Sequence, residues 1–95
     1  FFFFSDYIEW VQSELLYHID KGFIISGNTG VNSWKDMFLM SKCKYFVADN
    51  SANSWWAAWL NFDDNRIVIT PQSFQFEYPN LTHNKVGIQQ SWIKI

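Results

Sequence analysis

The sequence predicts an α/β fold in which a parallel sheet carries helices on its faces. Four short apolar runs, at residues 1–4, 23–26, 45–48 and 66–70, alternate with three stretches in which apolar residues recur at helical spacing. Turn-forming residues separate them, as in "GNTGVN" at 27–32. Because strands that alternate with helices form consecutive βαβ units with right-handed crossovers, the predicted architecture is Rossmann-like.

The first βαβ unit begins with "FFFF", an uncharged run that we expect to be a strand buried on both faces. Ser5 is placed to cap a helix in which Ile8, Val11 and Leu15 recur on one side. Gly22 is expected to end this helix, before the second strand. Since the chain opens inside a strand, we expect residues 1–95 to be a single partial domain of a longer protein.

The second helix is predicted to start at Ser33, which forms a capping box with Asp36 three positions later. Its apolar side carries Met37, Leu39, Met40 and Cys43. A third strand follows at 45–48.

The third helix is predicted to begin after Ser51 or Ser54 and to run to about Asn61. Trp55, Trp56, Trp59 and Leu60 fall within about 140° of its circumference, with Ala58 and Asn61 outside that arc. This arc is the expected core face. A fourth strand, "RIVIT", ends at Pro71, an irregular loop region is expected at 72–91, and "SWIKI" adds a last strand or a helix contact.

Composition excludes several classes of function. The net charge is −2 and no segment concentrates Lys and Arg, which argues against nucleic-acid binding. Cys43 is the lone cysteine, so no disulfide can form within the chain, and with two His no metal-ligand spacing is evident. No apolar run reaches the roughly 18 residues of a membrane span. We expect a cytoplasmic protein, with peripheral membrane association of the full-length protein as an alternative.

Polar residues follow three of the predicted strands. Ligands of parallel α/β sheets bind beyond the carboxyl ends of the strands, where loops enter helices. Asp6, residues 27–36 and residues 49–54 would all lie on that edge. The sequence therefore predicts one rim built from three loops.

Three blocks, "FFFFSDY", "DMFLMSKCKYFVADNSANSWWAAWLN" and "RIVITP", together with the terminal "WIKI", resemble the C-terminal part of bacterial-type α-1,2-fucosyltransferases. The resemblance implies the GDP-fucose-binding half of a GT-B enzyme that works without a metal or other cofactor. Its partners would be GDP-fucose, a galactose-terminated glycan acceptor and the missing N-terminal part of the same protein. The family's upstream "H-x-R-x-x-D" motif is absent, so we expect the chain to be inactive alone.

The resemblance also assigns residues to the binding of the sugar donor. Asp36 matches an acid that accepts hydrogen bonds from guanine, although its capping role explains it equally well. Ser51, Ala52, Asn53 and Ser54 match a turn whose amides and hydroxyls, at a helix N-terminus, would hold the diphosphate. Ordinary helix capping by the two serines is the alternative.

Several positions depart from the family pattern. Ala52 replaces a hydroxyl residue, Asn53 a Phe and Ala57 a Gly, which puts donor affinity in doubt. Asp6 matches the first acid of "F-S-D-D", where Tyr7 replaces the second. We interpret Asp6 either as a group that organises the sugar or arginine, or as a favourable charge at a helix start.

Two functional hypotheses result. One is part of an α-1,2-fucosyltransferase, and the alternative is a non-catalytic or decayed module that binds a nucleotide sugar. A distant third is a phospho-acceptor domain, because Asp49 ends the third strand and could act with Asp6 and Thr70.

Overall fold

The structure, a computed structural model, describes residues 1–72 and 88–95. Backbone contacts divide the chain into two compact units, Phe1–Asp36 and Met37–Ile95. Most of the predicted irregular region, 72–91, lies outside the described residues. Across the described part of the chain, no helix is long and apolar enough to cross a membrane.

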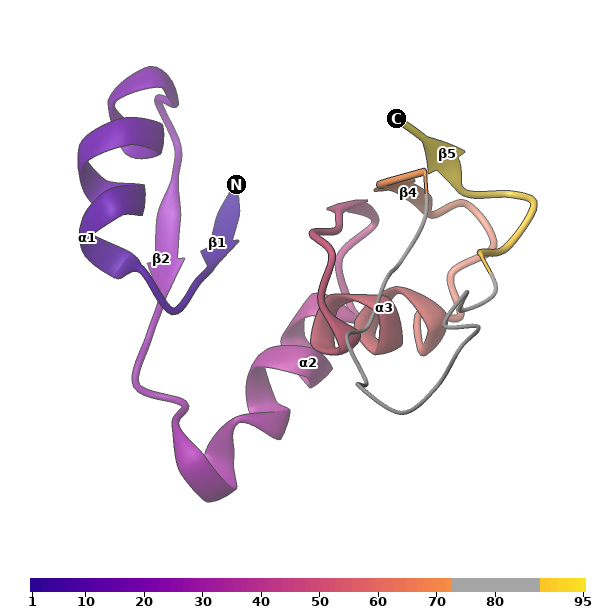
Figure 1. Cartoon of the computed structure of the whole chain (residues 1–95), viewed down its shortest axis with the longest axis horizontal. Coiled ribbons are helices and arrows are strands. Elements are labelled where there is room, and N and C mark those ends of the chain that lie inside the picture. Colours follow the sequence, from indigo (N-terminus) through magenta and orange to yellow (C-terminus); the bar gives the residue numbers. More distant parts are fainter. Residues whose placement is uncertain (73–87) are drawn as a thin grey trace, which may run out of the picture. The chain divides into compact units, whose positions relative to one another are not determined.

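The first unit contains one parallel strand pair. β1 (Phe2–Phe4) pairs with β2 (Phe23–Ile25), so that Phe2 lies opposite Phe23. The helical segment between them runs beside the pair (Figure 1), which confirms the predicted βαβ connection. The prediction that the opening run is buried on both faces is wrong, because Phe2 and Phe23 are 61% and 60% exposed. A single helical segment covers only one face of the pair.

The connection between β1 and β2 is less regular than predicted. A short α1 (Ile8–Trp10) continues into a π-helical turn, η1 (Val11–Leu15), and a 3-10 turn, η2 (Leu16–His18). Ser5 does not cap α1, because its Oγ accepts a hydrogen bond from the amide of Tyr7, 3.0 Å away, in the turn before the helix.

Gly22 does not end a helix and lies close to two side chains of the same unit. A Cβ at this position would overlap Leu16 Cδ2 and lie 3.0 Å from Phe3 Cε2. The close approach of the chain to these two side chains therefore explains the glycine.

The second helix is preceded by a 3-10 turn, η3 (Gly30–Asn32). α2 (Trp34–Met40) starts one residue after Ser33 and ends before Cys43, so it is shorter than predicted. Met40 is buried, whereas Leu39, which was expected on the same apolar side, is 43% exposed.

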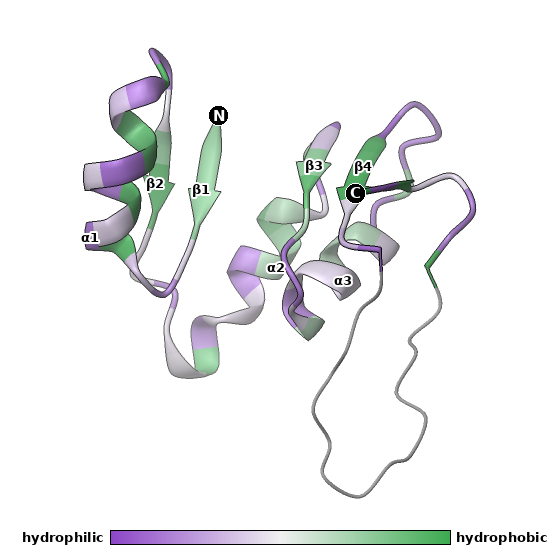
Figure 2. Ribbon diagram, turned by 45° about the horizontal axis from the view of Figure 1, so that its top comes forward, coloured by the Kyte–Doolittle hydropathy of each residue, from purple (hydrophilic) through white to green (hydrophobic). Residues whose placement is uncertain are grey.

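The second unit contains a parallel sheet of three strands in the order β3 (Tyr45–Val47), β4 (Ile67–Thr70) and β5 (Ile93–Lys94). "SWIKI" thus supplies a strand, one of the two predicted outcomes. The apolar strands stand out in Figure 2. Alternate residues along β3 and β4 are buried, namely Phe46, Val68 and Thr70, and so is Ala48 just after β3. This alternation defines the core side of the sheet.

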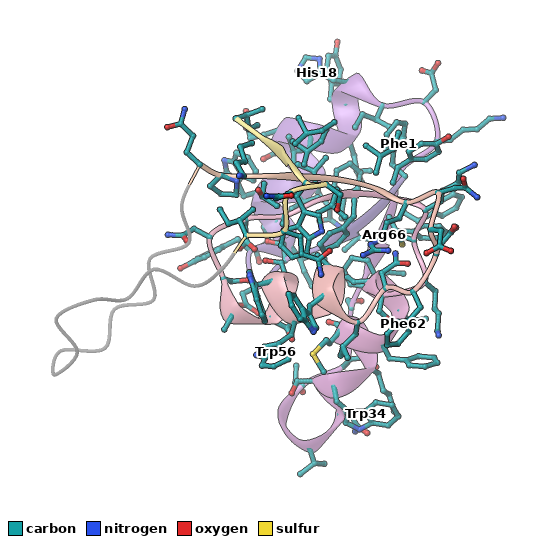
Figure 3. All side chains as sticks on the ribbon, turned by 90° about the vertical axis from the view of Figure 1, so that its right-hand side faces the viewer. Phe1, His18, Trp34, Trp56, Phe62 and Arg66 are labelled. Atoms are coloured by element: carbon teal, nitrogen blue, oxygen red, sulfur yellow. The ribbon has the colours of Figure 1, made fainter. Side chains whose placement is uncertain are left out.

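The predicted core face of α3 (Ala52–Trp59) is largely wrong. Trp55, Ala57 and Ala58 are buried, but Trp56 and Trp59 are 49% and 43% exposed. Figure 3 shows Trp56 on the side of α3 away from the strands. Small side chains at 57 and 58 let the helix approach its neighbours closely, which leaves the larger rings outside. Trp59 stacks on Trp55, with ring centroids 5.1 Å apart.

Asn61, predicted to lie outside the core face, is buried. Its Nδ2 donates to the carbonyl of Cys43, 2.6 Å away, and its Oδ1 accepts from the amide of Asp63 at 3.0 Å. Both ends of the amide are therefore satisfied, as burial requires. Asn61 links the end of α3 to the segment that enters β3.

Candidate functional site

The predicted site residues fall in both units. In the first unit the parallel register of β1 and β2 places the loops after Phe4 and Ile25 at one edge, so Asp6 and the turn at 27–36 leave the same side. In the second unit residues 49–54 follow β3 and lead into α3. Each group occupies the carboxyl edge of its own strands, as predicted; a single rim formed by all three loops stays a prediction.

Asp6 is exposed in the turn between β1 and α1. Its carboxylate has no hydrogen-bond partner among the residues that the structure describes. The nearby backbone is held instead by Ser5, which binds the amide of Tyr7. Asp6 is thus available to solvent at this edge, and nothing in the first unit orients it.

Asp36 is half-buried in the first turn of α2, and a neighbour orients its side chain. Asn28 Nδ2 donates to Asp36 Oδ1 over 2.6 Å. The predicted capping box is wrong: the amide of Ser33 donates to the carbonyl of Gly30, and the amide of Asp36 donates to the carbonyl of Ser33. The carboxylate keeps acceptor positions free beside its bond to Asn28.

Ser51 caps α3, which confirms one of the two predicted caps. Its Oγ accepts a hydrogen bond from the amide of Ser54 at 3.2 Å. The amides of Ala52 and Asn53, in the same first turn, have no partner within the described residues. Both residues are exposed. These two N–H groups, at the positive end of the helix dipole, can still bind an anion.

The two serine hydroxyls are occupied by Asp49. Ser51 Oγ donates to Asp49 Oδ1 over 2.7 Å, and Ser54 Oγ donates to the same oxygen. A hydroxyl has one proton to donate, so in this arrangement neither serine has one left for a phosphate. The role of these hydroxyls in holding a diphosphate stays a prediction, and in this structure the nearby carboxylate accepts both of their protons.

Sequence reasoning missed two residues of these turns. From the sequence, Asp49 is placed only at the end of the third strand, as part of the phospho-acceptor alternative, although its position two residues before a capping serine is a signal for such a bond. Asn28 was counted as a turn former, and its spacing of eight residues from Asp36 gives no local signal. Only the path of the 27–36 turn brings those two side chains together.

The phospho-acceptor alternative gains no support. Asp49 Oδ1 already accepts two protons from serines, and Thr70 is fully buried. Asp6 belongs to the other unit.

No metal site is evident within the described residues, where no three His, Cys, Asp or Glu side chains are grouped closely enough to hold an ion. Cys43 is half-buried, and burial raises the pKa of its thiol above the usual value. A raised pKa keeps the thiol protonated and unreactive at neutral pH.

The profile of a family described as glycosyl transferase family 11 matches residues 1–95. The chain belongs to this family. The resemblance inferred from the three sequence blocks is thereby confirmed, and the parallel strands with flanking helices are compatible with a Rossmann-like fold. The GT-B architecture stays a prediction, since no solved structure matches the chain.

Two curated relatives from Escherichia coli extend the comparison. The "O-antigen biosynthesis glycosyltransferase WbnK" is 37% identical over 71 residues, which cover 75% of this chain and 23% of the relative. The "Alpha-1,2-colitosyltransferase" is 39% identical over 98 residues, which cover 100% of this chain and 32% of the relative. The chain thus spans a third or less of the length of these family members.

Proposed function

We propose that the chain is the part of an α-1,2-glycosyltransferase that binds the sugar donor, and that the whole enzyme transfers L-fucose from GDP-fucose to a galactoside hydroxyl. The observation that carries this proposal is the family match, which extends over residues 1–95. Within the second unit, the free amides of Ala52 and Asn53 are compatible with a diphosphate. Within the first unit, the oriented carboxylate of Asp36 is compatible with N–H donors of a base.

In the proposed reaction the acceptor hydroxyl attacks C1 of the donor sugar. The bond from C1 to the diphosphate oxygen breaks, the hydroxyl passes its proton to a basic group or to water, and GDP leaves with inversion at C1. Negative charge grows on the diphosphate during this step, so groups that stabilise it lower the barrier. The amides at the start of α3 would supply part of that stabilisation. We assign the rest of this stabilisation to an arginine outside these 95 residues. Without that arginine the chain is inactive.

A second candidate differs in the sugar. The relative that matches along the whole chain carries the name of a colitosyltransferase, which favours colitose as the transferred group. A third candidate, a decayed module that binds a nucleotide sugar without catalysis, is favoured by the contacts of Asp49. Its carboxylate occupies both hydroxyls that would otherwise face the diphosphate.

The test is to incubate the whole protein that carries this chain with GDP-fucose or GDP-colitose and a β-galactoside. Released GDP and the mass of the glycoside product are measured. The displacement described above transfers one deoxyhexose residue, which adds about 146 mass units to the acceptor. A product with this mass would be the fucoside. Product from GDP-colitose alone would select the second candidate. Nucleotide binding without product from either donor would select the third.

A further inference from the structure

Asn28 occupies a turn whose shape depends on glycine. It follows Gly27, which has φ of +86°, and precedes Gly30, which has φ of +57°. Both values lie in the left-handed region that glycine adopts without strain. The turn carries Asn28 back toward α2, where its Nδ2 lies 2.6 Å from Asp36 Oδ1. Both side chains are half-buried.

Local backbone structure does not require this contact. The amides of Ser33 and Asp36 already donate to backbone carbonyls at 3.1 and 3.2 Å, so the carboxylate is not needed to cap α2. No Lys or Arg forms an ion pair with Asp36 in the described part of the chain. A half-buried carboxylate is thus oriented by one neutral amide, through Oδ1 alone. Its Oδ2 has no partner among the described residues.

We infer that Asn28 is a positioning residue for nucleotide recognition: it fixes the carboxylate of Asp36 so that Oδ2 is presented to N–H donors of a base. This inference rests on the proposed binding of a GDP-sugar. A carboxylate that rotates freely points its oxygens in many directions. When a hydrogen bond holds Oδ1, the carboxylate points Oδ2 in a single direction. Guanine presents two adjacent N–H donors to such an acceptor, and adenine lacks that pair. Asn28 therefore sharpens the preference for guanine.

The experiment compares Asn28→Ala with Asn32→Ala in the purified protein. Asn32 is an exposed asparagine of η3 whose hydrogen bond to the carbonyl of Thr29 uses its backbone amide, which makes it a matched control. Affinities for GDP and ADP are measured by calorimetry, and Tm by circular dichroism. Asn28→Ala is expected to reduce the ratio of GDP to ADP affinity about tenfold, since a hydrogen bond to a charged group is lost. Asn32→Ala should leave the ratio unchanged.

A double mutant separates positioning from a general loss of structure. If Asn28 acts through Asp36, the ratio of GDP to ADP affinity is the same in Asp36→Ala and in the double mutant that also carries Asn28→Ala. Independent, additive losses would overturn the inference. Asn28→Ala could keep the ratio of GDP to ADP affinity while Asp36→Ala loses it. That result would reject the role of Asn28 and leave the proposed function standing.

Two other outcomes are covered. A wild-type protein that binds GDP and ADP equally would reject both the inference and the base-reading part of the proposed function. If Asn28→Ala melts well below the control, Asn28→Asp replaces it, because it keeps the size of the side chain but turns a second carboxylate toward Asp36. An unchanged ratio in that variant would overturn the inference.

Discussion

The turn at 27–36 and the turn at 49–54 each place an aspartate beside the start of a helix, but they use it in opposite ways. In the first unit an amide, Asn28, donates once to Asp36 and leaves the second carboxylate oxygen free. In the second unit two hydroxyls, Ser51 and Ser54, donate to one oxygen of Asp49. The first arrangement leaves one carboxylate oxygen open, and the second engages the protons of two hydroxyls at the positive end of α3. The partners of an aspartate therefore decide its role more than its position does.

Asp36→Asn should have the largest effect on this comparison. It replaces an acceptor oxygen by a donor NH₂, which faces the N–H groups of guanine and cannot bind them. We expect the preference for GDP over ADP to fall roughly a hundredfold, as when a site loses a polar group built for its ligand. Calorimetric titration with both nucleotides measures it. An unchanged preference would show that Asp36 does not contact the base.

Asp49→Asn should act in the opposite direction. It removes a negative charge from the proposed diphosphate site and weakens the hydrogen bonds from the two serine hydroxyls. We expect affinity for GDP to rise about tenfold, with less change for guanosine, which carries no phosphate. Asp64→Asn is the matched control, because it makes the same charge change in an exposed turn before β4. Equal gains in both variants would trace the effect to net charge and contradict the local explanation.

Ser51→Ala tests the cap of α3. Its Oγ accepts the amide of Ser54, and loss of such a cap costs about 1 kcal/mol. We expect a Tm lower by several degrees in thermal unfolding followed by circular dichroism. Asn53→Ala, at an exposed position of the same turn, should change Tm little. If both variants melt alike, the cap contributes nothing to stability.

Asp6→Asn should have the smallest effect. The carboxylate is exposed and has no partner in the described residues, so we expect the free energy of unfolding to change by less than about 0.5 kcal/mol. GDP affinity should also stay within twofold, roughly, for the same reason. A large loss of GDP affinity would instead support its interpretation as a group that organises the sugar. Urea unfolding and nucleotide titration provide the two measurements.

Sequence patterns predicted the strands better than the helices. All four apolar runs form strands, and the pairs β1–β2 and β3–β4 are parallel, because a helical segment connects the two strands of each pair. The first helix is broken into three short turns, and no property of Ile8, Val11 or Leu15 indicated it. Helical spacing predicts that a helix forms, but not how its hydrogen bonds shift along it.

From the sequence alone came the family, the parallel α/β class, a serine cap at the start of α3 and the presence of Asp36 beside a helix start. These depend on residues close together in the chain. Tertiary structure alone decided which tryptophans are buried. Trp55 lies both on the predicted core face and on the side of α3 that is buried in the structure. The small Ala57 and Ala58 let that side approach its neighbours more closely. It also brought Asn28 to Asp36, since a hydrogen bond across eight residues depends on the path of the turn between them.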